Sequence, residues 1–281
     1  MTHNYLIQRD SECKMCEELF SAIRQIIIDP KFLTWSNCSI PWFYRRTIDG
    51  LINICKSSKS GKLAIVGITG LAGSGKDTAT NLAHRLEPCL KFFDKTGINE
   101  APMPDTNIST TISKIRQFTT INLPFAAPLK KIAVNVGFTL QQVFDPKLKN
   151  EVDEFWGITP RQFLQMCGTE MFRKVWRDDV WVKVAEKQIK QLSETLVTDY
   201  GIIFVTDVRF PNEAQMIKDL GGHVIRINRP GVQMMNHASE NQIKDLPVDA
   251  EFINDCSTGA RWSVKFLVEL VKHFNPQIYW Q

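Results

Sequence analysis

The residues best suited to chemistry lie in a glycine-rich segment that follows an apolar run. Residues 70–78 read GLAGSGKDT, in which Gly75 stands five positions after Gly70 and is followed by Lys76. Glycines allow successive backbone N–H groups to turn inward around phosphate oxygens, which Cβ atoms would obstruct. The N-terminus of the next helix adds its dipole, and Lys76 can neutralise β- and γ-phosphate charge. Because a strand and a helix flank the segment, it predicts a nucleoside triphosphate site and not a simple glycine-rich turn.

The residues after Lys76 depart from the usual form of this motif. The strict pattern has Ser or Thr directly after the lysine, whereas this chain has Asp77 there and Thr78 next. Asp77 could cap the helix, hold a magnesium ion through water, or leave the metal to Thr78. The sequence leaves these three alternatives open, and both residues are candidate metal ligands.

A second motif, TDVRFPNEA at residues 206–214, combines an acid with a nearby arginine. An acidic residue at the carboxyl end of a buried strand lies in the ligand crevice of an open α/β sheet. Asp207 is therefore placed to support Mg²⁺ beside the phosphate loop, and Arg209 could grip a phosphate with two parallel hydrogen bonds. The plainer alternative is a helix-capping carboxylate with a surface salt bridge. The phosphate loop favours the functional interpretation.

Further cations are spread over the second half of the chain, as phosphoryl transfer requires when two anionic substrates meet. The candidates are Arg161, Arg173, Arg177, Arg229, Lys130 and Lys131. Lys130 is preferred over Lys131 as the lysine that reaches an anion. Arg226 is expected on a solvated face. Trp181 has apolar neighbours at helical spacing, which favours core packing over stacking on a base.

Strand and helix signals alternate after residue 60, which is typical of a three-layer α/β fold with a mainly parallel sheet. Strands are expected at 63–68, 90–93, 118–125, 201–206, 223–228 and 251–254. Helices are expected at 77–86, from Pro128, and at 159–167, 179–196, 212–220 and 262–274. We expect a P-loop kinase domain over residues 61–281.

Residues 1–60 read as a small helical extension, with helical spacing at 17–28 and 47–55 and a linker at 56–62. The net charge of +4 suits anionic small molecules but is too small to argue for nucleic acid as a partner. No long apolar run or signal-like N-terminus is present, so neither a membrane partner nor secretion is expected. Seven irregularly spaced cysteines indicate a reducing cytoplasm.

Taken together, the motifs resemble the bacteriophage deoxynucleoside monophosphate kinases over residues 63–257. The resemblance is carried by GLAGSGKDT, PLK (128–130), RQFLQMCGTE (161–170), WV (181–182), TDVRFPNEA, GGHVIRINRPG (221–231), HASE (237–240) and FIND (252–255). It implies transfer of the ATP γ-phosphate to a deoxynucleoside monophosphate for DNA synthesis, in the host cytoplasm if a phage encodes the chain. It also implies an adenylate-kinase-like fold and Mg²⁺, and members of this family are often homodimers.

The resemblance also implies roles for individual residues. The ATP phosphates would be held by Gly73, Gly75, Lys76, Asp77 and Thr78. The monophosphate and the transfer point would be lined by Lys130, Arg161, Gly168, Thr169, Trp181, Asp207, Arg209 and Glu213. The catalytic residues would be Lys76, Arg161, Asp207 and Arg209.

One departure concerns the phosphate loop itself, because some relatives carry basic residues where this chain has Leu71, Ala72 and Gly73. Either an arginine elsewhere supplies that charge or the rate is lower, and residues 172–179 are a candidate lid. Two alternatives stay open. The chain could be another small-molecule kinase resembling dephospho-coenzyme A kinase, or a nucleotide-dependent protein that binds nucleic acid or has a regulatory role.

Overall fold

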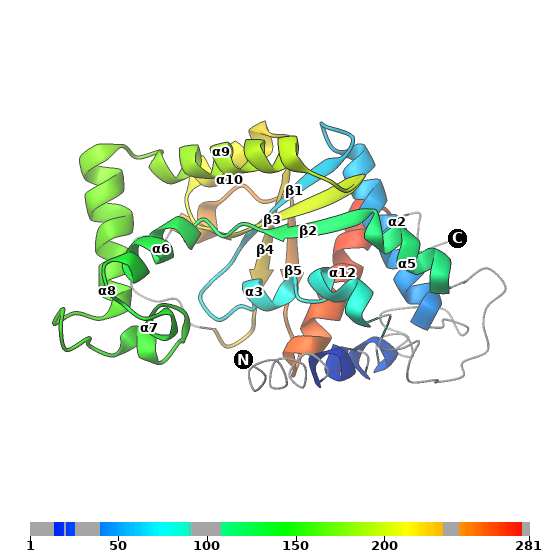
Figure 1. Cartoon of the computed structure of the whole chain (residues 1–281), viewed down its shortest axis with the longest axis horizontal. Helices are drawn as coiled ribbons and strands as arrows, with labels where there is room; N and C mark the ends of the chain where they lie inside the picture. The colour runs from blue at the N-terminus through cyan, green and yellow to red at the C-terminus, as the bar shows by residue number, and fades with distance from the viewer. Residues whose placement is uncertain are drawn as a thin grey trace.

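The computed structural model describes residues 14–19, 21–25, 40–89, 91, 108–232 and 242–276. Its centre is a five-stranded sheet with the order β2-β3-β1-β4-β5, in which every pairing is parallel (Figure 1). The strands are β1 (Leu63–Thr69), β2 (Phe118–Asn122), β3 (Tyr200–Val208), β4 (His223–Asn228) and β5 (Ala250–Ile253). The expected parallel α/β sheet is thus confirmed.

Two layers of helices cover the sheet because the central strands are apolar on both faces. On one face, Ala64, Val66 and Ile68 of β1 pack with α2 (Ile40–Ser57), α5 (Ile108–Arg116) and α12 (Gly259–Phe274). On the other face, Leu63 and Ile65 pack with α9 (Val180–Thr195) and α10 (Pro211–Asp219). The loops at the carboxyl ends of β1 and β3 are thereby held on a rigid three-layer frame.

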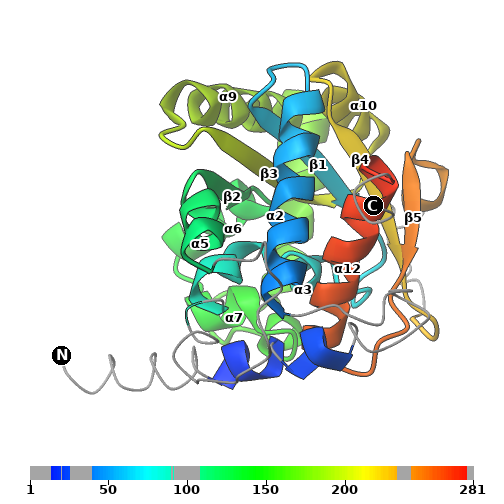
Figure 2. The same cartoon turned by 90° about the vertical axis from the view of Figure 1, so that its right-hand side faces the viewer.

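Helix α2 belongs to this frame, although its residues were expected in an extension. It lies beside α12 across one face of the sheet (Figure 2). Its residues Phe43, Ile48 and Leu51 are buried in the same core as Val66 of β1 and Val268 of α12. The division of the chain at residue 60, and the role of the residues before it, stay predictions.

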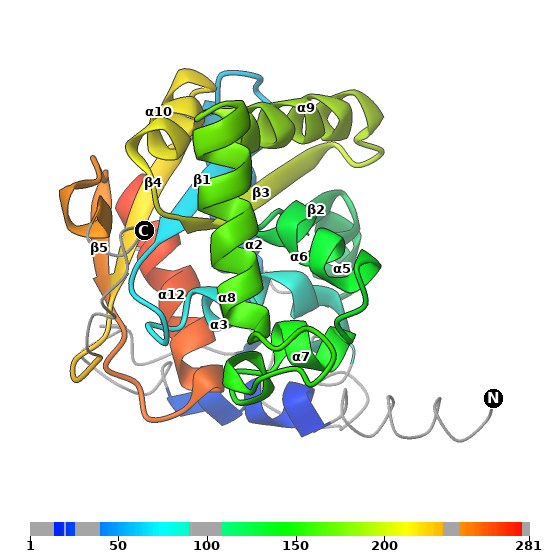
Figure 3. The same cartoon turned by 90° about the vertical axis from the view of Figure 1, so that its left-hand side faces the viewer.

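A smaller helical unit lies to one side of the sheet. It consists of α6 (Ala127–Asn135), α7 (Leu140–Phe144), η2 (Leu148–Asn150) and α8 (Pro160–Gln165), which continues as the π-helix η3 (Met166–Trp176). Figure 3 shows α8 and η3 as one long helix, with α6 and α7 beside it. The unit has its own core of Ala133, Phe138, Val143 and Leu164.

The region after the phosphate loop differs most from the sequence-based expectation. Instead of one helix over 77–86, it contains the short α3 (Lys76–Ala79), turns, and the 3₁₀-helix η1 (Ala83–Arg85). The strand expected at 90–93 is wrong at Lys91, which is helical like residues 86–89, and Leu90, Phe92 and Phe93 lie outside the described residues. Within the described ranges, no helix is both long and apolar enough to span a bilayer.

Candidate functional site

The loop between β1 and α3 has the backbone shape that its glycines predict. Gly70, Gly73 and Gly75 have φ values of 146°, 82° and 96°, in the region that side chains rarely enter. A Cβ on Gly75 would come within 2.5 Å of Asn254 Nδ2. A Cβ on Gly70 would come within 2.4 Å of the Ile227 carbonyl oxygen. These two glycines are therefore required by conformation and by space.

Three side chains from other elements hold the outer side of this loop. Asn254 Nδ2 donates to the Ser74 carbonyl at 2.9 Å, and Trp262 Nε1 donates to the Gly75 carbonyl at 3.0 Å. Arg229, one of the predicted cations, donates to the Gly73 carbonyl at 3.3 Å. Because these carbonyls are fixed from outside, the loop is held in one shape before any ligand binds. Sequence reasoning gave Asn254 and Trp262 no role.

Lys76 lies at the start of α3, under the loop. Its side chain is only 6% exposed, and Nζ donates to the Gly70 carbonyl at 2.7 Å and the Leu71 carbonyl at 2.9 Å. Carbonyl dipoles orient the ammonium group but do not cancel its charge. Lys76 is therefore a preoriented cation at the phosphate loop.

Asp207 is set by an irregularity at the end of β3. It is the one non-glycine residue with positive φ in the described ranges, at 63°. The register to β1 also shifts there, because Gly67 pairs with Val205 but Thr69 pairs with Val208. Such a bulge redirects a side chain and recurs beside functional sites. At the carboxyl end of β3, the Asp207 side chain is 16% exposed and its Oδ1 lies 3.9 Å from Arg209.

Asp77 and Asp207 influence each other across the loop. The pKa of Asp77 is raised, first by loss of solvation and then by the negative charge of Asp207, while Lys130, Lys76 and Lys149 oppose the rise. Two carboxylates that repel each other in this way are relieved by a cation between them. Carboxylate oxygens, and the hydroxyl of Thr78 next in the chain, are donors of the type that a hard ion such as Mg²⁺ takes.

A group of cations faces these carboxylates from the smaller helical unit and from the end of β3. It contains Lys130 of α6, Lys149 of η2, Arg161 of α8, and Arg209. Arg161 donates through Nε to Asn150 Oδ1 at 2.7 Å, and Lys130 Nζ lies 4.5 Å from the centre of the Phe144 ring. Lys130, Arg161 and Arg209 were predicted from the sequence. Lys149 was not, because it lies in no recognisable motif.

The predicted residues Gly168, Thr169 and Trp181 lie at the junction of η3 and α9. Trp181 is 7% exposed, donates through Nε1 to the Gly168 carbonyl at 2.9 Å, and packs against Phe172. A Cβ on Gly168 would come within 2.9 Å of Leu129. Trp181 thus packs in the core, as its helical spacing indicated, and fixes the π-helical turn that holds Gly168 and the half-buried Thr169.

Glu213 and Arg173 form a buried pair instead of lining an open cleft. Their side chains are both 4% exposed, and Arg173 donates to Glu213 Oε1 at 2.5 Å. The other oxygen of Glu213 accepts from the backbone N–H groups of Arg209 and Phe210. Burial raises the pKa of Glu213 to about 7, although Arg173 and these donors oppose the rise. Glu213 therefore positions the Arg209 backbone, and Arg173 does not reach the cleft as a lid cation.

Two other arginines named in the sequence analysis are also bound to groups of the protein itself. Arg177 pairs with Asp179 on the surface. The expectation of a solvated Arg226 is wrong, because its NH2 group donates to the carbonyls of Ile243, Lys244 and Leu246. The HASE motif at 237–240 lies outside the described residues.

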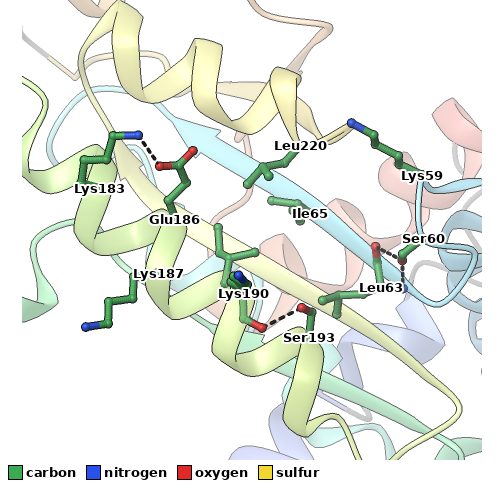
Figure 4. A pocket seen from close by; sticks show the side chains of 11 residues that line it. Lys59, Ser60, Leu63, Ile65, Lys183, Glu186, Lys187, Lys190, Ser193 and Leu220 are labelled. Carbon is green, nitrogen blue, oxygen red and sulfur yellow. Dashed lines mark hydrogen bonds and ion pairs between the residues drawn. The ribbon is translucent and has the colours of Figure 1, made fainter.

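A separate groove of about 640 Å³ lies away from the phosphate loop, between α9, α10 and the first residues of β1 (Figure 4). Its floor contains Leu63, Ile65, Ile189 and Leu220, and lysines of α9 stand along its rim. Since the phosphate loop follows the carboxyl end of β1 and this groove adjoins the amino end, the two are distinct.

Comparison with known proteins gave consistent results. Residues 105–259 match the family model described as deoxynucleotide monophosphate kinase. A protein of Acanthamoeba polyphaga mimivirus, whose name provisionally gives this activity, is 28% identical over 195 residues, covering 66% of this chain and 84% of that protein. The deoxynucleoside-5′-monophosphate kinase of Escherichia phage T5 is 22% identical over 228 residues, covering 68% of this chain and 89% of that enzyme.

Proposed function

Because this chain belongs to the deoxynucleotide monophosphate kinase family, we propose that it transfers the γ-phosphate of ATP to a deoxynucleoside 5′-monophosphate and releases the diphosphate. The observation that carries the proposal is the convergence of two charge systems. Lys76 of the phosphate loop lies on one side and the cations Lys130, Arg161 and Arg209 lie on the other. Asp77 and Asp207 lie between them and feel charges from both sides. A donor phosphate and an acceptor phosphate would each be bound by positively charged groups there.

The donor side of the reaction is assigned to the loop and α3. Backbone N–H groups between Gly70 and Gly75 would bind the ATP phosphates, and Lys76 would exchange its two carbonyl partners for β- and γ-phosphate oxygens. Charge–charge attraction favours this exchange because the carbonyls are neutral. Gly73 is the loop glycine with open space around it, so a ligand can approach its backbone closely.

The acceptor side is assigned to α6, α8 and the end of β3. Arg161 uses Nε for Asn150, so its two terminal nitrogens have no partner among the described residues and can bind a phosphate. Arg209 and Lys130 would hold the same anion. The 5′-phosphate acceptor is already an anion and needs no strong base, so catalysis rests on alignment and charge stabilisation.

Asp77, Thr78 and Asp207 would hold Mg²⁺, which when bound neutralises charge on the phosphate oxygens. Asp77 and Asp207 would then be ionised, because the cation favours their charged forms. We also propose that ATP is the phosphate donor, that the protein forms a homodimer, and that it acts in the cytoplasm of a host cell.

A coupled assay of ADP release with each of the four deoxynucleoside monophosphates tests the proposal. We expect turnover with at least one of them and none with dephospho-coenzyme A. Folded protein that turned over no deoxynucleoside monophosphate would refute the function. A steeply salt-dependent shift of DNA mobility without turnover would instead support the nucleic-acid-binding alternative.

The outer anchors of the loop give a further prediction. Changing Trp262 to Phe removes the donor to the Gly75 carbonyl but keeps a ring in the core beside Phe266. We expect the free energy of unfolding to fall by about 1 kcal/mol, because a partly buried carbonyl loses its donor. The KM for ATP should rise with little change in the KM for the acceptor.

Urea unfolding and initial-rate kinetics measure these effects, and Trp156→Phe is the matched control because Trp156 is 45% exposed and lies far from the loop in sequence. An unchanged KM for ATP in Trp262→Phe would show that the anchor does not shape the donor site.

A further inference from the structure

We propose that Lys149 is a direct ligand of the acceptor's 5′-phosphate, an assignment that rests on the proposed kinase function and extends it. Sequence motifs did not mark this residue, and no family resemblance placed it in the site. The proposal depends on where the turn between α7 and α8 holds the side chain, and on the charges that surround it.

The turn that carries Lys149 is held in one conformation by its own hydrogen bonds. Asp145 Oδ1 accepts from the backbone N–H groups of Lys147 and Leu148 at 2.8 and 3.0 Å. The N–H of Lys149 donates to the Asp145 carbonyl at 3.0 Å, and Asn150 Nδ2 donates to the Pro146 carbonyl at 2.7 Å. These bonds fix the backbone of the turn and so the direction in which each Cα–Cβ bond leaves it.

The same turn is fastened to the acceptor side of the site. Asn150, the residue after Lys149, accepts from Arg161 Nε at 2.7 Å, which ties η2 to the first turn of α8. Lys130 lies next to α7 through its contact with Phe144. Lys149 thus belongs to one group with Lys130, Arg161 and Arg209, three residues of three different elements.

The charge balance of this group indicates an anion. Lys149 has no ion pair or hydrogen bond from its ammonium group within the described ranges, although it is half-buried. Its charged neighbours are the cations Lys130, Arg161 and Arg209 and two carboxylates, Asp77 and Asp207, of which Asp207 is already 3.9 Å from Arg209. Burial and these cations lower the pKa of Lys149 to about 8. These four cations outnumber the two carboxylates, and a dianionic phosphate would stabilise the excess positive charge.

The neighbours also distinguish the acceptor from the donor phosphate. Lys130 and Arg161 are the cations that most affect Lys149, and Asn150, the residue after it, accepts from Arg161 Nε at 2.7 Å, while on the loop side Lys149 acts on Asp77. Lys149 therefore faces the nucleotide that receives the phosphoryl group. A ligand there stabilises the bound monophosphate before and during transfer.

The test compares Lys149→Met, Lys149→Arg and Lys147→Met in the full chain by initial-rate kinetics. We expect Lys149→Met to raise the KM for the deoxynucleoside monophosphate by about 10- to 100-fold, as for loss of one charge-assisted hydrogen bond, with the KM for ATP within about twofold of the unchanged chain. Lys149→Arg should restore most of the affinity because it keeps the charge. Lys147→Met, an exposed neighbour in the same turn, should have no effect.

The midpoint of urea unfolding should be the same for all variants, which separates ligand binding from folding. With an active unchanged chain, an unaltered acceptor KM in Lys149→Met, or an equal rise in both KM values, would overturn the role of Lys149 and leave the kinase function standing. An unchanged chain that turned over no deoxynucleoside monophosphate would overturn both.

Discussion

Replacing Lys76 by methionine should lower kcat/KM for phosphoryl transfer by about 10³-fold while the protein stays folded. Lys76 is the cation fixed at the phosphate loop, with Nζ 2.7 Å from the Gly70 carbonyl and 2.9 Å from that of Leu71. Charge that develops on the transferred group meets it without any reorganisation of the site. Methionine has similar length and no charge, so it fills the same space under the loop.

Initial rates at saturating and limiting ATP, with ADP release as the signal, measure this effect. Lys131→Met is the matched control, since Lys131 is exposed on α6 one position beyond the acceptor cation Lys130. A Lys76→Met protein that unfolds at the same urea concentration as the unchanged chain but keeps more than a tenth of its activity would contradict the assignment. Loss of activity in both variants would point to a general loss of positive charge.

The central strands and the glycine-rich loop could be predicted because their determinants are local. The apolar run of β1 and the glycines after it need no distant partner to be recognised. Asp207 and Arg209 followed from the rule that strand ends line the crevice of a parallel sheet. The bulge that orients Asp207 could not be predicted, because it depends on the register between β1 and β3.

The residues that sequence reasoning missed depend on contacts between distant segments. Trp262 meets Gly75 across 187 positions, and Asn254 meets Ser74 across 180. Nothing local distinguishes Trp262 from any other core tryptophan, although Asn254 stood in the FIND motif without an assigned role. Arg226 was misjudged for the same reason, because the three carbonyls that it binds follow about twenty positions later.

The buried pair of Arg173 and Glu213 makes the second large prediction. Replacing Arg173 by methionine should lower the free energy of unfolding by about 3–5 kcal/mol at pH 8, because it leaves a buried carboxylate without its cation. Arg173 also stacks at 3.8 Å over the Phe210 ring and donates to the Asp178 carbonyl at 2.9 Å, so packing is lost as well. The loss should be smaller at pH 5.

The pH dependence follows from Glu213, whose pKa is raised from 4.5 to about 7 by burial. A raised carboxyl pKa means that the folded protein holds a proton that the unfolded chain has released. The stability that this extra proton on Glu213 contributes is fully present below pH 4.5 and is lost as the pH rises through 7. Without Arg173 the pKa of Glu213 rises further. Arg173→Met should therefore lose most stability at pH 8, because folding at that pH must either bury the charged carboxylate or add a proton to it.

Urea unfolding of the unchanged chain and the variant at pH 5 and pH 8 measures how much Arg173→Met lowers the free energy of unfolding at each pH. Other titrating groups are the same in both proteins, so their contributions cancel. Arg177→Met is the matched control, because Arg177 pairs with Asp179 on the surface, where solvent screens the pair and its loss has little effect on stability. Since Glu213 also binds the backbone N–H of Arg209 at 2.8 Å, Arg173→Met should raise the KM for the acceptor. Equal destabilisation at the two pH values would mean that Arg173 acts through packing alone and that the charge of Glu213 contributes nothing.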